Sequence, residues 1–162
     1  MQEGGAFRSI TNKILDGYLG KTGNDWVASL SASRSKALAD AKVTTDVIWQ
    51  KINEAQAKAA KANMSPFLGT YTDQWFGAAT ISDAGDKYRF DSKRSPRLTG
   101  QILPYKGNAF VVKWDDRSMD ADAFLTFTTD EDGKATGFTM KAISPLTDFS
   151  FDFHDLDFRR VK

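Results

Sequence analysis

Eight short runs of strand-forming residues, separated by turn residues, fill about the last hundred positions of the chain. The separators include Asp83-Ala84-Gly85-Asp86, Lys106-Gly107-Asn108 and Asp130-Glu131-Asp132-Gly133. Connections this short leave no room for crossover helices, so the pattern predicts an antiparallel sheet. The predicted strands are residues 68–73, 75–82, 87–92, 97–103, 109–115, 123–129, 134–142 and 155–161.

Alternation of apolar side chains within these runs indicates how the sheet closes. Phe110, Val112 and Trp114, for example, share one face of their strand. Eight antiparallel strands can close into a barrel and so remove both sheet edges, whereas a two-sheet sandwich is the competing architecture. We favour the barrel because every connection but one is hairpin-short. The exception, from residue 143 to about residue 154, is expected to cross one mouth of the barrel.

The first part of the chain is predicted to be helical. Residues 6 to about 62 are rich in alanine and lysine and contain no proline. Gly20 is expected to end a first helix, whose apolar residues recur at three-to-four spacing. This apolar stripe consists of Phe7, Ile10, Ile14, Leu15 and Tyr18.

Two further helices are expected before the sheet. Asn24 or Asp25 can cap a second helix that starts at Trp26, and Thr45 can cap a third. The apolar stripe of the third helix consists of Ile48, Ile52, Ala55 and Ala59.

The predicted fold class is therefore α+β, with N-terminal helices followed by a mainly antiparallel eight-stranded β-barrel. The domain division that we expect is a helical segment over residues 1–62 and a barrel domain over residues 63–162.

Composition limits the possible functions. Lys and Arg number 22 against 21 Asp and Glu, a net charge of +1, so no strong field favours nucleic acid as a partner. No apolar run reaches the roughly 18 residues that a membrane span needs. Cysteine is absent, which excludes disulfides, thiolate metal sites and cysteine nucleophiles. The first residues lack the pattern of a signal peptide and look like an arbitrary start within a longer chain.

Two fragments match motifs of serine hydrolases, but their context indicates chance. Ser33-Arg34-Ser35-Lys36 matches S-x-x-K, in which a lysine activates a serine nucleophile, and Lys21-Thr22-Gly23 matches the K-T-G strand motif. Their order is reversed, and only nine residues separate Gly23 from Ser33. His154 is the only histidine, and the chain contains no G-x-S-x-G motif that would supply a serine nucleophile for it. We therefore interpret His154 as a hydrogen-bonded residue at the barrel rim. We therefore predict no catalytic residue.

No metal or cofactor is predicted either. A metal site would need more histidine or cysteine ligands than the chain offers. Asp115, Asp116, Asp120 and Asp122 form an acidic cluster, but their spacing does not fit the ligand positions of an EF-hand loop.

Arginines and acids gather in three unusual stretches of the barrel segment, and two interpretations stay open. Forked guanidinium–carboxylate pairs can brace loops at a barrel rim, and the even match of arginines and acids favours this. The same arginines could hold a carboxylate ligand beside an aromatic wall. The candidate residues are Trp75, Arg94, Arg97, Trp114, Arg117, Asp120 and Asp148.

Several blocks of the barrel segment resemble one family. The blocks are Phe67-Leu68-Gly69-Thr70-Tyr71-Thr72-Asp73-Gln74-Trp75-Phe76-Gly77, Ser95-Pro96-Arg97-Leu98, Trp114-Asp115-Asp116-Arg117 with Asp120-Ala121-Asp122-Ala123, and Ser144-Pro145-Leu146-Thr147-Asp148-Phe149-Ser150-Phe151-Asp152-Phe153. In this order, over about residues 64–162, they resemble the domain of unknown function at the C-terminus of many bacterial serine hydrolases of the β-lactamase and penicillin-binding-protein class.

The helical part resembles the end of the hydrolase domain itself. Ile14-Leu15-Asp16-Gly17-Tyr18-Leu19-Gly20 and Asp25-Trp26 are similar to its closing segment, and residues 31–62 would be the connecting helix. The resemblance implies a lipocalin-like barrel, a nucleophilic serine that lies upstream of this chain, and no catalytic residue that can be carried over.

Three hypotheses follow from the resemblance and the residues. The first is a non-catalytic accessory domain that packs beside the catalytic domain of the parent hydrolase, shapes substrate access or holds subunits together. The second is a lipocalin-like barrel that binds a small molecule, although large inward side chains favour a filled core. The third is a homo-oligomer formed through residues 6–30. The location stays open, with a periplasmic or secreted parent protein as the expectation from related hydrolases.

Overall fold

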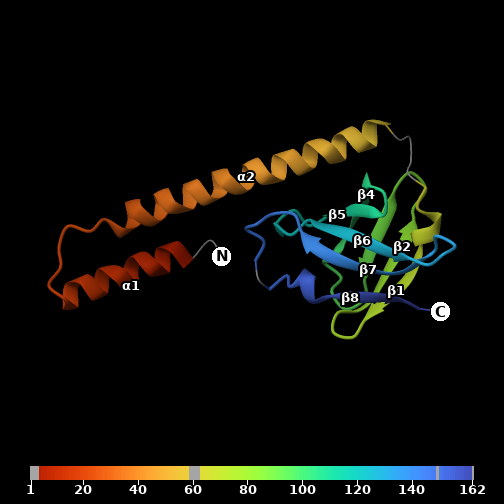
Figure 1. The fold of residues 1–162 in the computed structure, drawn as a ribbon. Coiled ribbons are helices and arrows are strands. Elements are labelled where there is room, and N and C mark those ends of the chain that lie inside the picture. Colours follow the sequence, from red (N-terminus) through yellow and green to blue (C-terminus); the bar gives the residue numbers. More distant parts are fainter. Residues whose placement is uncertain (1–3, 59–62, 149, 162) are drawn as a thin grey trace. The chain divides into compact units, whose positions relative to one another are not determined.

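The structure is a computed structural model of the chain, and it describes residues 4–58, 63–148 and 150–161. The chain forms two compact units, the helical unit, Met1–Val43, and the barrel unit, Thr44–Lys162. The helices are α1 (Gly4–Tyr18) and α2 (Trp26–Lys58), and two 3₁₀ turns are η1 (Ser65–Phe67) and η2 (Phe153–Asp155). The strands are β1 (Gly69–Asp73), β2 (Gly77–Asp83), β3 (Tyr88–Ser92), β4 (Thr99–Lys106), β5 (Ala109–Trp114), β6 (Ala123–Thr129), β7 (Ala135–Ala142) and β8 (Asp157–Arg160) (Figure 1).

In the helical unit, the side chain of Asp16 joins α1 to the start of α2. Its Oδ2 accepts hydrogen bonds from Asn24 Nδ2 at 2.8 Å and from Trp26 Nε1 at 2.7 Å. These donors, Asn24 foremost, hold the pKa of Asp16 below its usual 3.8. Gly20, at φ +63°, follows the end of α1, and its left-handed backbone fits the predicted stop.

A single continuous helix, α2, replaces the predicted second and third helices. Asp25 caps it as predicted, because its Oδ1 accepts the N–H of Ala28 at 2.9 Å. The prediction that a new helix starts at Thr45 is wrong, since α2 contains neither glycine nor proline to interrupt its hydrogen bonds. Ala59, the last residue of the predicted stripe, lies outside the described residues.

The eight strands form a closed antiparallel barrel in sequence order, which confirms the predicted α+β class and excludes the sandwich. β8 returns to β1 and closes the cylinder through the pairs Tyr71↔Arg160 and Thr72↔Arg159. All eight predicted strands are present, with ends that shift by at most three residues. β2, for example, begins at Gly77 and not at residue 75, because the Asp73 carboxylate holds the N–H groups of residues 75 and 76 in a turn.

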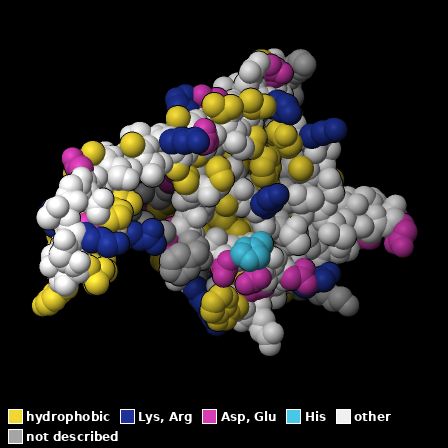
Figure 2. All heavy atoms as spheres, turned by 60° about the vertical axis from the view of Figure 1, so that its left-hand side comes forward, with side chains coloured by type: hydrophobic (Ala, Val, Ile, Leu, Met, Phe, Trp, Pro, Cys, Tyr) yellow, Lys and Arg dark blue, Asp and Glu magenta, His cyan; other side chains and the backbone are white. Residues whose placement is uncertain are grey.

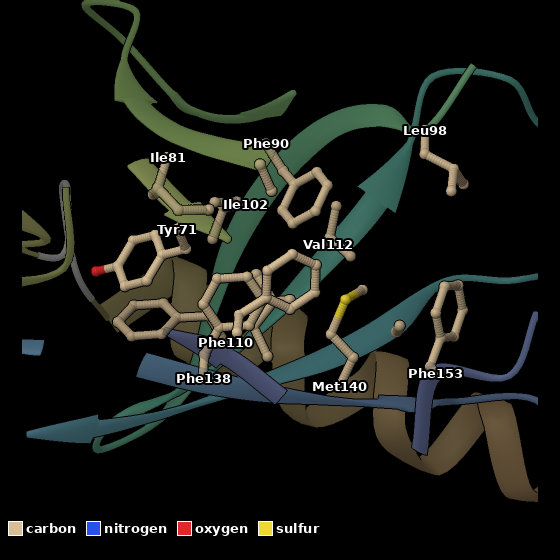
Figure 3. Packing of buried hydrophobic residues seen from close by; sticks show 14 of the residues in the cluster. Tyr71, Ile81, Phe90, Leu98, Ile102, Phe110, Val112, Phe138, Met140 and Phe153 are labelled. Carbon is tan, nitrogen blue, oxygen red and sulfur yellow. The ribbon is translucent and has the colours of Figure 1, made fainter. Parts of the chain in front are cut away.

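Aromatic side chains occupy the interior of the barrel. On β5, Phe110 and Trp114 point inward as predicted and are 3% and 1% exposed. The rings of Phe138 and Phe158 stack with 4.4 Å between their centroids, and Tyr71 meets Phe138 edge-on at 5.0 Å. Figure 3 shows Tyr71, Phe110 and Phe138 converging from different strands of the cylinder. Large rings in mutual contact therefore take the positions that would otherwise enclose a cavity.

The segment before β1 covers one end of the barrel. The ring of Phe67, in η1, lies 5.2 Å from Phe110 and 4.8 Å from Phe127 between centroids. Arg160 holds this segment, since its guanidinium donates to the carbonyl oxygens of Pro66 and Ala135 at 3.0 Å each and also to that of Leu68. One arginine of β8 thus links the segment that covers the end of the barrel to the strands of the barrel.

The C-terminal half of α2 covers part of the outer surface of the barrel. Ile52 is completely buried and packs with Leu103, Val111 and Ile143 in a second apolar cluster. This explains why β5 carries consecutive apolar residues: alternate side chains serve the interior and the helix-covered face.

We expect Ile52→Ala to lower the free energy of unfolding by about 2–4 kcal/mol, because it removes buried methyl and methylene groups and leaves a cavity. Urea denaturation followed by tryptophan fluorescence measures the change. The matched control is Lys51→Ala, an exposed neighbour on the same helix, for which we expect about 0.5 kcal/mol or less. Equal losses in the two variants would contradict the packing of α2 on the barrel.

Candidate functional site

Four connections meet at one end of the barrel. Because successive strands run in opposite directions, the β1–β2, β3–β4, β5–β6 and β7–β8 connections share the same end. Residues from all four line an open cleft of about 440 Å³, which we call the rim cleft. Its apolar lining consists of Trp75, Phe76, Leu98, Met119, Phe151, Phe153 and Leu156, and its polar lining of Arg94, Ser95, Arg97, Ser150 and Asp152.

Asp73 organises the β1–β2 turn, which carries the aromatic wall of the cleft. Its Oδ1 accepts the N–H groups of Trp75 at 2.8 Å and Phe76 at 2.7 Å, and its Oδ2 accepts the N–H of Asp157 at 3.0 Å. Burial alone would raise the pKa of Asp73, but the three backbone donors together hold it below 3.8. One buried carboxylate therefore fixes the turn and ties it to β8.

Arg94 crosses this turn and reaches the lip of the cleft. Its Nη1 donates to the carbonyl oxygen of Trp75 at 2.9 Å. Its aliphatic part lies against Gly77, where a Cβ atom would come within 2.8 Å of Arg94 Cδ. Gly77 also has a φ of +84°, which residues with a side chain rarely adopt. Glycine is thus required here both for the turn and for the path of the arginine.

Arg97, the other arginine of the cleft, is paired with a carboxylate. Its Nε and Nη2 donate to Asp116 Oδ2 at 2.9 and 2.5 Å. Ser118 also serves Asp116, because its hydroxyl and its N–H donate to Oδ1 at 2.6 and 3.0 Å. The hydroxyl of Ser118 and the guanidinium of Arg97 lower the pKa of Asp116 to about 2. The sequence did not single out this pair, since nothing local links residues of two different loops.

Asp122 is the centre of the β5–β6 loop. Its Oδ1 accepts the backbone N–H of Trp114 at 3.0 Å, and its two oxygens accept Nη1 and Nη2 of Arg117 at 2.7 Å each. The indole N–H of Trp114 donates to the carbonyl oxygen of Ala121 at 2.7 Å. The carboxylate is 9% exposed, so the acidic partner is shielded from water. These bonds brace the loop beneath the cleft.

The long β7–β8 connection, predicted to cross a barrel mouth, brings Phe153 into the core. Phe153 is 3% exposed, and its ring centroid lies 6.3 Å from that of Trp114. Phe151 lies 5.8 Å from Phe153 and faces the cleft. Phe149, the first member of this alternating run, lies outside the described residues.

His154 lies at the surface of the same connection, where Figure 2 shows the histidine beside acidic side chains. Its Nδ1 is 3.1 Å from Asp152 Oδ1, and its Nε2 is 3.6 Å from Asp155 Oδ1. Ligand atoms of these three residues lie within 4.8 Å of one another, a spacing that a metal ion could bridge. All three side chains are substantially exposed, however, and the pairing of an imidazole with two carboxylates accounts for the arrangement.

The structure brings together only some of the residues singled out from the sequence. Trp75, Arg94 and Arg97 meet at the rim cleft. Trp114 lies in the core, and Arg117 braces the β5–β6 loop. The carbonyl oxygen of Asp120 accepts the Thr147 hydroxyl at 2.9 Å, whereas Asp148 Oδ1 accepts the N–H of Ser150 at 2.9 Å. Phe76, considered with Trp75 as a possible aromatic wall, also lines the cleft. Sequence reasoning missed Asp73 and Phe151, because a turn acid and a core-type phenylalanine carry no distinctive local signal.

The two hydrolase-like motifs lie in the helical unit. Ser33 and Lys36 are exposed on α2, and Lys21-Thr22-Gly23 lies in the connection between α1 and α2 and not on a strand. Neither motif contributes to the rim cleft.

Comparison with known families identifies the barrel unit. A family model for a domain of unknown function, DUF3471, matches residues 53–160. The chain belongs to this family. The match spans the end of α2, all eight strands and every residue of the rim cleft, and it bears out the predicted domain of unknown function. No curated protein and no solved structure matches the chain. Among the described residues, no helix has both the length and the apolar character that crossing a membrane requires.

In this DUF3471 barrel, we expect Asp122→Ala to lower the free energy of unfolding by about 2–3 kcal/mol, because it leaves a buried N–H and a guanidinium without their acceptor. Thermal or urea denaturation measures the loss. Asp120→Ala is the matched control on the same loop, since the Asp120 side chain is exposed, and it should cost about 0.5 kcal/mol or less. A loss for Asp122→Ala no larger than the control would refute the bracing role.

Acid is expected to weaken the contribution of Asp73 to stability. Because the pKa of Asp73 is lowered below 3.8 by folding, its ionised form stabilises the protein above that pH, and the contribution disappears as the pH falls through the folded-state pKa. Asp73→Asn should therefore cost about 1–3 kcal/mol at neutral pH, and the gap from the wild type should narrow below about pH 4. Urea titrations at pH 7 and at several acidic pH values test this. A gap that does not change with pH would contradict it.

Proposed function

We propose that this DUF3471 chain is a non-catalytic accessory part of a serine hydrolase of the β-lactamase and penicillin-binding-protein class. In this proposal, the helical unit is the closing segment of the catalytic domain, and the barrel packs beside that domain. The barrel would then influence substrate access or hold subunits together. The parentage is suggested by the resemblance of Ile14-Leu15-Asp16-Gly17-Tyr18-Leu19-Gly20 and Asp25-Trp26 to that segment.

The observation that carries the proposal is an exposed apolar stripe on α1. Its residues are Phe7, Ile10, Ile14, Leu15 and Tyr18, which are 72%, 62%, 54%, 52% and 87% exposed. The opposite side of α1 carries Ser9 and Asp16, which are buried and bond to the start of α2. A helix with one face engaged and an exposed apolar face opposite is typical of a segment that packs against a further domain.

The chemistry of the described residues supports a non-catalytic role. The nitrogens of His154 face two carboxylates, whereas a general base would face the hydroxyl of a serine. Ser33 and Lys36 are exposed on a helix surface, where nothing desolvates the lysine or orients a substrate.

A lipocalin-like barrel that binds a small molecule is the second candidate. The aromatic rings in the interior disfavour a ligand at the centre of the barrel, because an eight-stranded barrel encloses little more space than its own side chains fill. The rim cleft, at the end of the barrel, is where a small molecule could still bind.

Two measurements test the accessory role. The genomic reading frame upstream should encode a hydrolase domain with an S-x-x-K motif, and the chain alone should not turn over nitrocefin, p-nitrophenyl esters or D-amino-acid amides. In the full-length protein, Ile10→Asp combined with Ile14→Asp should lower the melting temperature by several degrees, because charges replace an apolar contact. Arg8→Asp, an exposed position beside the stripe, is the control and should have little effect.

Other outcomes would overturn the proposal. Turnover by the chain that Ser33→Ala abolishes would show that it is an enzyme. Self-association of the isolated chain in sedimentation experiments, abolished by the same double substitution, would instead assign the stripe to a second copy of this chain.

A further inference from the structure

We propose that the rim cleft binds an organic monocarboxylate with an apolar or aromatic body, and that Arg94 holds its carboxylate group. The inference rests on the barrel unit alone and does not depend on the hydrolase parentage.

Arg94 differs from the other arginines of the barrel unit. Within the described part of the chain, four of them form ion pairs: Arg89 with Asp115, Arg97 with Asp116, Arg117 with Asp122, and Arg159 with Asp157. Arg160 donates to three backbone carbonyl groups. The guanidinium of Arg94 makes one hydrogen bond to the described residues, to the carbonyl oxygen of Trp75, and faces no carboxylate. It keeps donors for a ligand.

The position of this guanidinium is fixed before any ligand arrives. Nη1 is anchored to Trp75, and the side chain runs across the bare backbone of Gly77. The turn beneath is held by the Asp73 carboxylate. A cation that is already oriented loses little conformational entropy when it binds a carboxylate, and its planar fork matches the two carboxylate oxygens.

An apolar surface lies beside the cation. Trp75 is 77% exposed, although contact of so large an apolar side chain with water is unfavourable. Together with Phe76 and Phe151 it lines the cleft. Phe153 and Leu98, both buried, lie at the base of the wall. The cleft volume of about 440 Å³ is in the range of small-molecule sites. An aromatic ring or a short acyl chain can therefore stack there while its acid group reaches Arg94.

The charges around the cleft favour one negative group. Arg97 is neutralised by Asp116, and the Asp152 carboxylate lies 3.1 Å from His154. The guanidinium of Arg94 forms no ion pair with the described residues, and a monocarboxylate can supply its counter-charge. Such a group can belong to a free acid or to the C-terminal residue of a peptide.

Calorimetric titration and ligand-observed NMR with four probes test the proposal on the full chain. The probes are 3-phenylpropionate, its amide, an acetylated dipeptide ending in phenylalanine with a free carboxylate, and the amide of that dipeptide. We expect at least one acid to bind roughly tenfold more tightly than its matched amide, because a charge-assisted forked contact is lost in the amide. A preference for 3-phenylpropionate would identify a free acid as the ligand, and a preference for the dipeptide acid a peptide C-terminus.

Variants assign the contact. Arg94→Gln should remove the preference of acid over amide, whereas Arg94→Lys should keep part of it, because lysine keeps the charge without the fork. Trp75→Ala should weaken acid and amide alike. Arg159→Gln, at an exposed arginine paired with Asp157 on β8, is the matched control and should bind like the wild type. Arg94 is exposed, and melting temperatures check that each variant is folded.

Three outcomes would overturn the proposal: no binding of any probe to the wild type, equal affinity for acids and amides, or an acid preference that survives in Arg94→Gln.

Discussion

Closure of the barrel depends on the short strand at its C-terminal side, β8. This strand pairs with β1 through only two residue pairs, and one of them uses Arg160. The guanidinium of the same residue binds carbonyl groups of Pro66, Leu68 and Ala135, so it joins the end cover to β7. These carbonyl groups are partly shielded from water, and the guanidinium satisfies all three as hydrogen-bond acceptors. The stacking of Phe158 on Phe138 anchors β8 from the inside. The four residues of β8 therefore take part in closing the sheet, in holding the end cover and in packing the interior.

The opposite end of the barrel is built on a different interaction, the acceptance of backbone N–H groups by aspartates. Asp73, Asp116, Asp122 and Asp148 each hold a rim connection in this way. Because the loops obtain their hydrogen bonds from side chains within the same end of the barrel, they can keep an open cleft without collapsing onto it. These four carboxylates are therefore used within the rim itself, and Arg94, which has no carboxylate partner among the described residues, stands out beside them.

The barrel could be predicted from the sequence because its signals are local. Turn residues and two-residue alternation mark each strand, and both act over a few neighbouring positions. The continuous α2 was missed because a capping threonine such as Thr45 is also tolerated inside a long helix when no glycine or proline follows. At the rim, arginines and acids were recognised as a group, but their pairing could not be predicted. Arg97 meets Asp116 only through the register of β4 and β5. Trp114, also named among the rim candidates, lies in the core, where its alternation with Phe110 and Val112 on β5 had already placed it.

The cover that α2 provides on the outside of the barrel has a practical meaning for anyone who divides this protein. Leu103 and Val111 point away from the interior and are shielded by Ile52 of the helix. A fragment that starts at residue 63 would expose this apolar patch on the sheet surface. Such a fragment would tend to aggregate or to self-associate. Thr44, where the barrel unit begins, is the safer place for the first residue of a shortened protein, even though the family resemblance starts later, at residue 53.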